Sequence, residues 1–187
     1  MYLFFLIVVV FYYIYKNVEV LEVYNSDEQL EVYKDNELFN LSDKEILTRT
    51  IWAESRASSD LEQGLVGQVI INRVRDNRFP DTIKKVCLQD KQFSPWNAPV
   101  SKTDNSYKVR LKNLTDKQSY KEVEKITEKV LNGFYETKIS DNTCHFIAVD
   151  HNRIRTNGSR IISAYVSWAV GAEIEWTGDH YFLRGVN

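Results

Sequence analysis

The sequence contains little cysteine, little histidine and almost no net charge. Its 187 residues include two cysteines and three histidines, and the formal net charge is −2. Two cysteines cannot build a disulfide framework, so Cys87 and Cys144 either form one bridge in an exported protein or stay free. The balanced charge argues against a general nucleic-acid-binding protein, which needs a cationic surface to hold phosphates. No nucleic-acid partner is therefore expected.

Patterns for metal and thiol chemistry are also missing. Metal-ligating residue types occur at His145, Asp150, His151 and His180, but no His-Glu-x-x-His spacing or similar signature joins them. Neither cysteine lies in a glycine-rich setting at the start of a predicted helix, so nothing in the pattern activates a thiolate. Catalysis by a cysteine paired with His180 is kept as an alternative. The sequence predicts no metal site and no cofactor.

The chain opens with a long apolar run. Tyr2–Tyr15 is uninterrupted apolar and aromatic sequence, and as a helix it would span about 20 Å, short of the hydrocarbon layer of about 30 Å. No basic segment precedes the run and no small-residue cleavage site follows it. We therefore expect residues 1–18 to form an uncleaved apolar helix that anchors the chain to a membrane. A buried strand or assembly interface is the alternative. Residues 19–40 are predicted to be a stalk, and residues 41–187 the globular domain.

An amphipathic helix predicted over residues 42–56 places an acid on its apolar face. A serine followed three residues later by a glutamate forms a capping box at its start. Glu54 lies on the same stripe as Ile46, which is predicted to face the core. Burial in that stripe disfavours the charged carboxylate and raises its pKa, which prepares a general acid. The alternative is that Glu54 lies at the rim and pairs with Arg49 or Arg56.

A second helix is predicted to follow. Ser59 and Glu62 form another capping box, and helical spacing continues to about Arg75. Gly64 and Gly67 lie inside this helix. Because glycine weakens a helix, we expect the two glycines to allow another helix to approach closely.

The last third of the domain changes from helical to strand-like spacing. Residues 144–149 and 174–183 have strand patterns, and Arg155–Gly158 is typical of a turn. We expect neighbouring strands to bring His145 and His180 together along a groove, more as hydrogen-bonded scaffold than as catalytic groups. The predicted fold class is α+β, a mainly helical domain with a small antiparallel sheet.

Several short motifs resemble one family in both order and spacing. They are Trp52-Ala-Glu-Ser-Arg-Ala, Gly64 and Gly67 leading to Asn72-Arg73, Arg78-Phe-Pro80-Asp-Thr82, Gln92-Phe-Ser94-Pro-Trp96, Thr143-Cys-His145-Phe, Trp168-Ala and Gly178-Asp-His180-Tyr-Phe182. Together they resemble the catalytic domain of the SleB/CwlJ cell wall hydrolases over about residues 41–183. The chain departs from that pattern at Cys144, which stands between Thr143 and His145, and in Lys102–Lys117, which looks like an insertion.

The resemblance implies an enzyme that cleaves the glycan strands of peptidoglycan, with a fold similar to lysozyme-like lytic transglycosylases and Glu54 as the catalytic acid. Such cleavage needs a proton on the leaving oxygen, which a half-buried glutamic acid can supply. No second acid obviously pairs with Glu54, because Asp60 and Glu62 are explained as capping residues and Asp81 as a helix start. This favours a lytic transglycosylase. A two-carboxylate lysozyme-type hydrolase and an inactive membrane-anchored binding protein of the same fold are the alternatives.

Further residues are assigned to the substrate by their type. Polar side chains in a loop suit hydrogen bonds to an N-acetyl group, and aromatic rings suit stacking on sugar faces, although loop packing explains Trp96 equally well. The expected substrate-binding residues are Gln92, Phe93, Ser94, Trp96, His145 and His180, and the expected supporting residues are Asn72, Arg73 and Thr143. The expected location is membrane-anchored with the domain facing the cell wall, either in a bacterium or in a bacteriophage-encoded protein.

Overall fold

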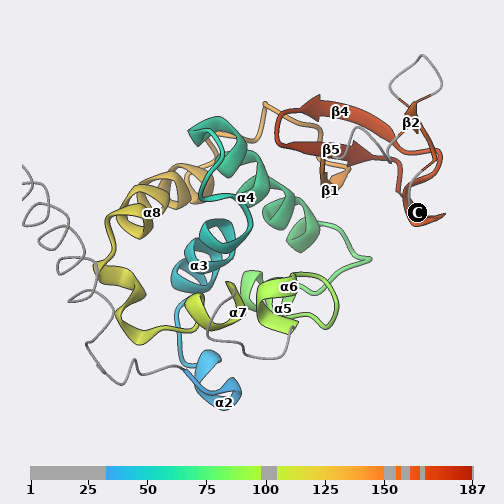
Figure 1. The fold of residues 1–187 in the computed structure, drawn as a ribbon. Coiled ribbons are helices and arrows are strands. Elements are labelled where there is room, and N and C mark those ends of the chain that lie inside the picture. The colour runs from blue at the N-terminus through green and yellow to red at the C-terminus, as the bar shows by residue number, and fades with distance from the viewer. Residues whose placement is uncertain (1–32, 98–104, 150–154, 157–160, 165–166, 187) are drawn as a thin grey trace, which may run out of the picture. The chain divides into compact units, whose positions relative to one another are not determined.

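The fold is a set of helices joined to a small antiparallel sheet. The structure is a computed structural model that describes residues 33–97, 105–149, 155–156, 161–164 and 167–186. The predicted anchor, residues 1–18, lies outside these ranges. The helices are α2 (Asp35–Leu38), α3 (Asp43–Ser55), α4 (Asp60–Arg75), α5 (Ile83–Cys87), α6 (Ser94–Asn97), α7 (Asn105–Lys108) and α8 (Gln118–Leu131), with short 3₁₀ turns η1 (Lys112–Asp116) and η2 (Ser167–Ala169). This arrangement confirms the predicted α+β class (Figure 1).

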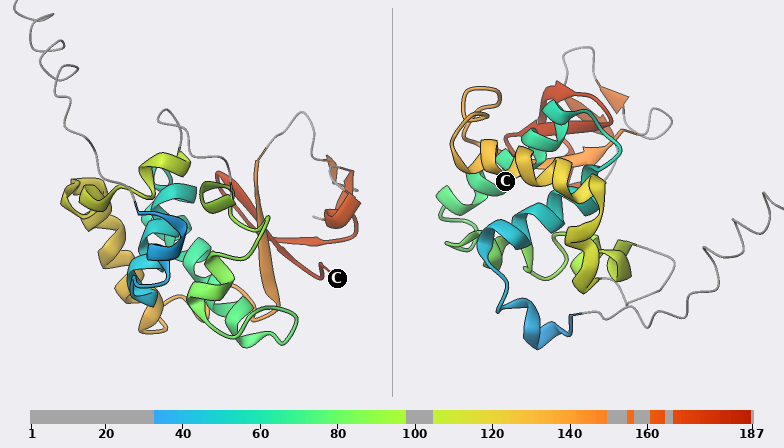
Figure 2. Two further views of the ribbon diagram at one scale, coloured as in Figure 1. Left: turned by 90° about the horizontal axis from the view of Figure 1, so that it is seen from below. Right: turned by 90° about the vertical axis from the view of Figure 1, so that its left-hand side faces the viewer.

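Helix α3 is the central helix of the described part. It packs against α4, α5, α6 and α8, and Figures 1 and 2 show these helices around it. Its predicted start is confirmed, since the Ser42 hydroxyl accepts a hydrogen bond of 3.1 Å from the backbone N–H of Glu45. The second hydrogen bond of the predicted capping box, in which the Glu45 side chain would bond back to the backbone of Ser42, is replaced by an ion pair between Glu45 and Arg49. Glu54 therefore lies in the last turn of a helix that is fixed on several sides.

Helix α4 also begins where the sequence predicts. The Ser59 hydroxyl accepts from the backbone N–H of Glu62. A methyl group at Gly67 would lie 2.8 Å from a methyl of Val130 and 2.9 Å from one of Ile51. Since Val130 belongs to α8 and Ile51 to α3, the expectation of close helix approach at this glycine is confirmed.

The sheet contains three antiparallel strands in the order β1-β5-β4. Strand β1 spans Thr143–Ala148, β4 spans Glu173–Thr177 and β5 spans His180–Arg184. A separate antiparallel pair joins β2 (Arg155–Thr156), where a turn was expected, to β3 (Ile162–Ala164).

The two faces of the central strand β5 enter different cores, because side chains alternate along a strand. Phe182 packs with the helices, whereas Tyr181 and Leu183 pack in a second cluster with Ile162 and Ile174. Strand β1 contacts α4, so the sheet is attached to the helices beside the end of α3. Within the residues that the structure describes, no helix is long and apolar enough to cross a lipid bilayer.

The packed domain begins before residue 41, the predicted start of the globular part. Leu38 of α2 is buried in the helical core, and Tyr33 packs against it. The last part of the predicted stalk, from residue 33, is therefore a packed portion of the domain.

Candidate active site

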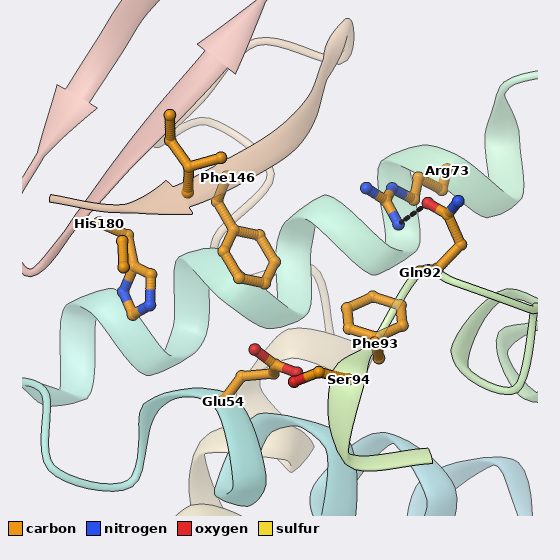
Figure 3. Close-up of a pocket in the computed structure, with 9 residues that line it drawn as sticks. Glu54, Arg73, Gln92, Phe93, Ser94, Phe146 and His180 are labelled. Carbon is orange, nitrogen blue, oxygen red and sulfur yellow. Dashed lines mark hydrogen bonds between the residues drawn. The ribbon is translucent and has the colours of Figure 1, made fainter. Parts of the chain in front are cut away.

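Glu54 points into a cavity between the helices and the sheet. The cavity has a volume of about 210 Å³ and is lined by Glu54, Arg73, Gln92, Phe93, Ser94, Phe146, Ile147, Ala148 and His180. Figure 3 shows Glu54 entering from α3, with Phe146 and His180 of the sheet on the opposite side. The predicted pairing of Glu54 with a neighbouring arginine does not occur: Arg49 binds Glu45 and two backbone carbonyls, and Arg56 lies over the Trp52 ring.

One oxygen of the Glu54 carboxyl group, Oε1, is buried and has no hydrogen-bond partner among the described residues. Burial raises the pKa of Glu54 from 4.5 to about 7, and the positive charge of Arg73 opposes this shift. Desolvation favours the neutral acid, and nothing nearby is paired with its anion. Glu54 is therefore a carboxyl group of which about half still carries a proton at neutral pH, and it opens onto a cavity.

Arg73 fixes the loop that closes one side of the cavity. Its guanidinium donates to the backbone carbonyl of Cys144 at 2.6 Å and to Oε1 of Gln92 at 3.2 Å. Since the Gln92 oxygen is occupied, its amide N–H₂ group is left to donate to a ligand. Gln92 and Ser94 both line the cavity, as expected for residues that bind a polar substrate.

His180 is held in place by a buried carboxylate. Glu62, which is 2% exposed, accepts hydrogen bonds from the backbone N–H groups of Asp179 and His180 at 3.1 and 2.7 Å, and its Oε1 lies 2.7 Å from Nδ1 of the His180 ring. A carboxylate only accepts, so Nδ1 carries a proton, and in the neutral ring Nε2 is left as an acceptor. The prediction that Glu62 completes a capping box is wrong, because its side chain binds the β4–β5 turn instead.

The two histidines do not meet. In the sheet register His145 pairs with Leu183 while His180 pairs with Ala148. The His145 ring lies instead against Phe79 and Trp168, with centroids 5.9 and 5.6 Å away. Burial, together with the positive charges of Arg73 and Arg78, lowers the pKa of His145 to about 4. His145 is therefore a neutral packing residue at neutral pH, and only His180 lines the cavity that contains Glu54.

Two aromatic residues expected to stack on sugars are packed instead. Trp96 is 5% exposed, and its indole N–H donates to the Thr50 hydroxyl at 2.9 Å. It belongs to the core, because a buried indole needs that hydrogen bond and finds it there. Phe93 lines the cavity but is only 2% exposed and lies beneath the Arg73 guanidinium. Its ring forms a wall rather than an open stacking surface.

Asn72 and Thr143 support the sheet. The Asn72 amide donates to the carbonyls of Ser140 and Thr143 at 3.0 Å each, and the Thr143 hydroxyl donates to Glu175. Asn72 thus joins α4 to the start of β1, and the Thr143 side chain joins β1 to β4. They therefore position Phe146 and the rest of β1 beside the cavity.

Of the four candidate metal ligands, Asp150 and His151 lie outside the described residues. Within the described ranges, no three His, Cys, Asp or Glu side chains gather as a metal site would require. Cys87 and Cys144 are free and buried. Burial raises the pKa of Cys87 to about 12 and also raises that of Cys144, which opposes formation of a nucleophilic thiolate.

A comparison with protein families identifies the chain. The model of the cell wall hydrolase family matches residues 57–183, about two thirds of the sequence. The chain belongs to the cell wall hydrolase family. This match includes Arg73, Gln92 and His180 but begins three residues after Glu54, so the evidence for Glu54 comes from its position in the structure.

Other comparisons add less. The catalytic domain of the germination-specific lytic transglycosylase SleB from Bacillus anthracis is similar in structure, with 19% sequence identity, a TM-score of 0.47, and coverage of 81% of this chain and 97% of that one. A likeness of this degree does not carry a function from one protein to the other. No curated protein matches the chain.

Sequence reasoning missed the role of Glu62 in this cell wall hydrolase. A usable signal was present, because Glu62 lies on the stripe that continues through Val66 and Val69 of α4, as Glu54 does on α3. A second signal was the glycine at position 178. In the structure, an added methyl group there would lie 2.5 Å from Oε2 of Glu62. A glycine directly before Asp179-His180 indicates that another group approaches the turn closely.

Proposed function

We propose that this cell wall hydrolase cleaves the glycosidic bonds of peptidoglycan glycan strands, with Glu54 as general acid. The observation that carries the proposal is the Glu54 carboxyl group, which has a pKa near 7 and one buried oxygen without a partner at the edge of a cavity. A glycosidic oxygen is a poor leaving group until it is protonated, and an acid with a pKa near neutral pH can protonate it.

The reaction can be followed through the proton of Glu54. Glu54 gives its proton to the glycosidic oxygen as the bond from that oxygen to C1 breaks, and positive charge develops on the sugar ring. The resulting Glu54 carboxylate then takes a proton from the hydroxyl group that attacks C1, which restores the acid. One glutamate therefore serves as acid in the first step and as base in the second.

The surroundings of Glu54 favour the transglycosylase form of this reaction. Among the described residues that line its cavity, Glu54 is the only carboxylic acid. The nearby Glu62 accepts from two backbone N–H groups and one ring nitrogen, so it is not available as a nucleophile. Since no second free carboxylate among the described lining residues can direct water, the muramic acid C6 hydroxyl is the nucleophile that best suits the site. The product is a 1,6-anhydro end.

The other cavity residues are proposed to hold the sugar. The amide of Gln92 and the hydroxyl of Ser94 suit the oxygen atoms of an N-acetyl group. Nε2 of His180 suits a sugar hydroxyl, because Glu62 keeps this nitrogen as an acceptor. Phe146 lies edge-on to the His180 ring, with centroids 5.4 Å apart, and gives the cavity an apolar wall. Glu62 is in this scheme a positioning residue that acts through His180.

Mass analysis of the fragments released from purified peptidoglycan tests the proposal. We expect the full chain to release fragments that end in 1,6-anhydro-muramic acid, each one water lighter than a hydrolysed fragment. Glu54→Gln is expected to abolish release, whereas Glu122→Gln, at an exposed position of α8, should leave it unchanged. Hydrolysed ends would replace the transglycosylase by the two-carboxylate mechanism, and release by Glu54→Gln within about tenfold of the unmodified chain would remove Glu54 from the acid's role.

The apolar segment before the domain is proposed to hold the enzyme at the membrane, facing the cell wall. The proposal rests on the uninterrupted apolar sequence of Tyr2–Tyr15. Fractionation of cells that express the full chain should find it in the membrane pellet, and deletion of residues 2–18 should move it to the soluble fraction. A full chain that stays soluble would contradict this tether.

A further inference from the structure

A second cavity continues from the one that contains Glu54. It has a volume of about 370 Å³ and is lined by Lys91, His145, Trp168 and Val186 together with Arg73, Gln92 and Phe146. The last three residues also line the first cavity. The two hollows therefore share a wall, and a linear polymer bound at Glu54 has a path into the second one.

An exposed tryptophan forms one side of this second cavity. Trp168 is 46% exposed, although a ring of this size is normally covered. Its ring contacts the His145 ring, which also contacts the Phe79 ring. These contacts restrict the motion of the indole. A fixed, exposed aromatic surface suits the apolar face of a sugar ring, because little side-chain freedom is lost when the sugar stacks.

The same cavity also presents a cation. Lys91 has a φ of 61°, the one positive value among the described residues other than glycine. A positive φ is uncommon for a residue other than glycine, and here it forms a tight turn. The turn leads directly into Gln92 and Ser94. Within the described ranges, no side chain pairs with the Lys91 ammonium group, and no acid lines the cavity.

We infer that the second cavity is a saccharide subsite that binds a muramic acid unit of the strand, with the sugar stacked on Trp168 and its carboxylate at Lys91. The inference rests on the proposed cleavage of peptidoglycan. In such a strand, muramic acid carries a lactyl group whose carboxylate is either free or joined to a peptide that has carboxylates of its own. A neutral stacking surface beside an unpaired cation matches both parts of this ligand.

Binding to the full chain carrying Glu54→Gln tests the subsite without turnover. Calorimetry would use three hexasaccharides: one of N-acetylglucosamine alone, one alternating with muramic acid bearing free lactyl carboxylates, and one alternating with peptide-bearing muramic acid. Trp168→Ala should weaken binding of all three about tenfold, the loss of one aromatic contact. Lys91→Gln should weaken only the two that carry carboxylates, about threefold or more, and salt should diminish this effect. The more affected ligand identifies the carboxylate source.

Matched controls are available on the same chain. Phe134→Ala removes another exposed aromatic ring and Lys125→Gln another exposed lysine, and neither should alter binding. Thermal unfolding of each variant checks that it is folded.

Each contrary result has a defined meaning. Binding unaffected by Trp168→Ala would overturn the subsite, and equal weakening of all three ligands by Lys91→Gln would overturn the carboxylate assignment. If the unmodified chain cleaves peptidoglycan but Glu54→Gln binds none of the ligands, the subsite fails while the proposed function stands. If no cleavage occurs but binding depends on Trp168, the proposed function fails and the subsite stands.

Discussion

Replacing Glu54 by glutamine should make the folded protein more stable at alkaline pH while it abolishes cleavage. Burial raises the pKa of Glu54 from 4.5 to about 7, so between these values the folded state holds a proton that the unfolded state has released. Stability therefore falls as the pH rises through this window. At 1.36 kcal/mol for each pKa unit, the rise from 4.5 to about 7 lowers the free energy of unfolding by at most about 3 kcal/mol above pH 7, since Glu54 keeps some contact with solvent.

Glutamine has nearly the same shape but no charge to bury, so the variant escapes this penalty. Urea unfolding of the two proteins should show nearly equal stability at about pH 4 and an advantage of up to about 3 kcal/mol for Glu54→Gln at about pH 8. Glu122→Gln, at an exposed site, should show no pH-dependent difference. A constant difference between Glu54→Gln and the unmodified protein across this range would refute the assignment of a raised pKa.

The remaining predictions concern the surroundings of Glu54. Glu62→Gln should lower kcat about 100-fold without unfolding the protein, since an amide has one acceptor oxygen for three N–H donors and cannot hold both the turn and the His180 ring. Nitrogen NMR of that ring reports its tautomer, which a merely structural role of Glu62 would leave unchanged. A chelator or cysteine alkylation should leave the cleavage rate unchanged, and a loss would revive the metal or thiol mechanisms. Gly67→Val should lower the free energy of unfolding by about 2 kcal/mol or more, measured by urea, because its methyl groups meet Val130 and Ile51.

Much of the helical part could be predicted because its signals are local. Serine caps mark the starts of α3 and α4 within single turns of sequence, and both are found at Ser42 and Ser59. Apolar spacing placed Glu54 on the buried side of α3, where it is found. These features depend on residues at most a few positions apart, so no knowledge of the tertiary fold was needed.

The parts that could not be predicted depend on distant partners. Glu45 was expected to complete a cap but pairs with Arg49, whose guanidinium is buried against the carbonyls of Val109 and Leu111. Trp96 was offered for sugar stacking but is buried beside Thr50, 46 residues earlier in the chain. Spacing along a sequence shows which side chains share a face, but it does not show what packs against that face.

The two glutamates at this site, Glu54 and Glu62, show how the partners of a carboxyl group decide its chemistry. Glu54 and Glu62 lie on the apolar stripes of successive helices, and the sequence pattern alone treats them alike. Glu62 meets three N–H donors from Asp179 and His180, which occupy both of its oxygens. Glu54 meets none at Oε1, and desolvation outweighs the positive charge of Arg73 and raises the pKa of Glu54 to about 7. The sheet thus sets the roles of the two glutamates. It binds Glu62 and so orients His180, and it offers no partner to Oε1 of Glu54, which is left as an acid.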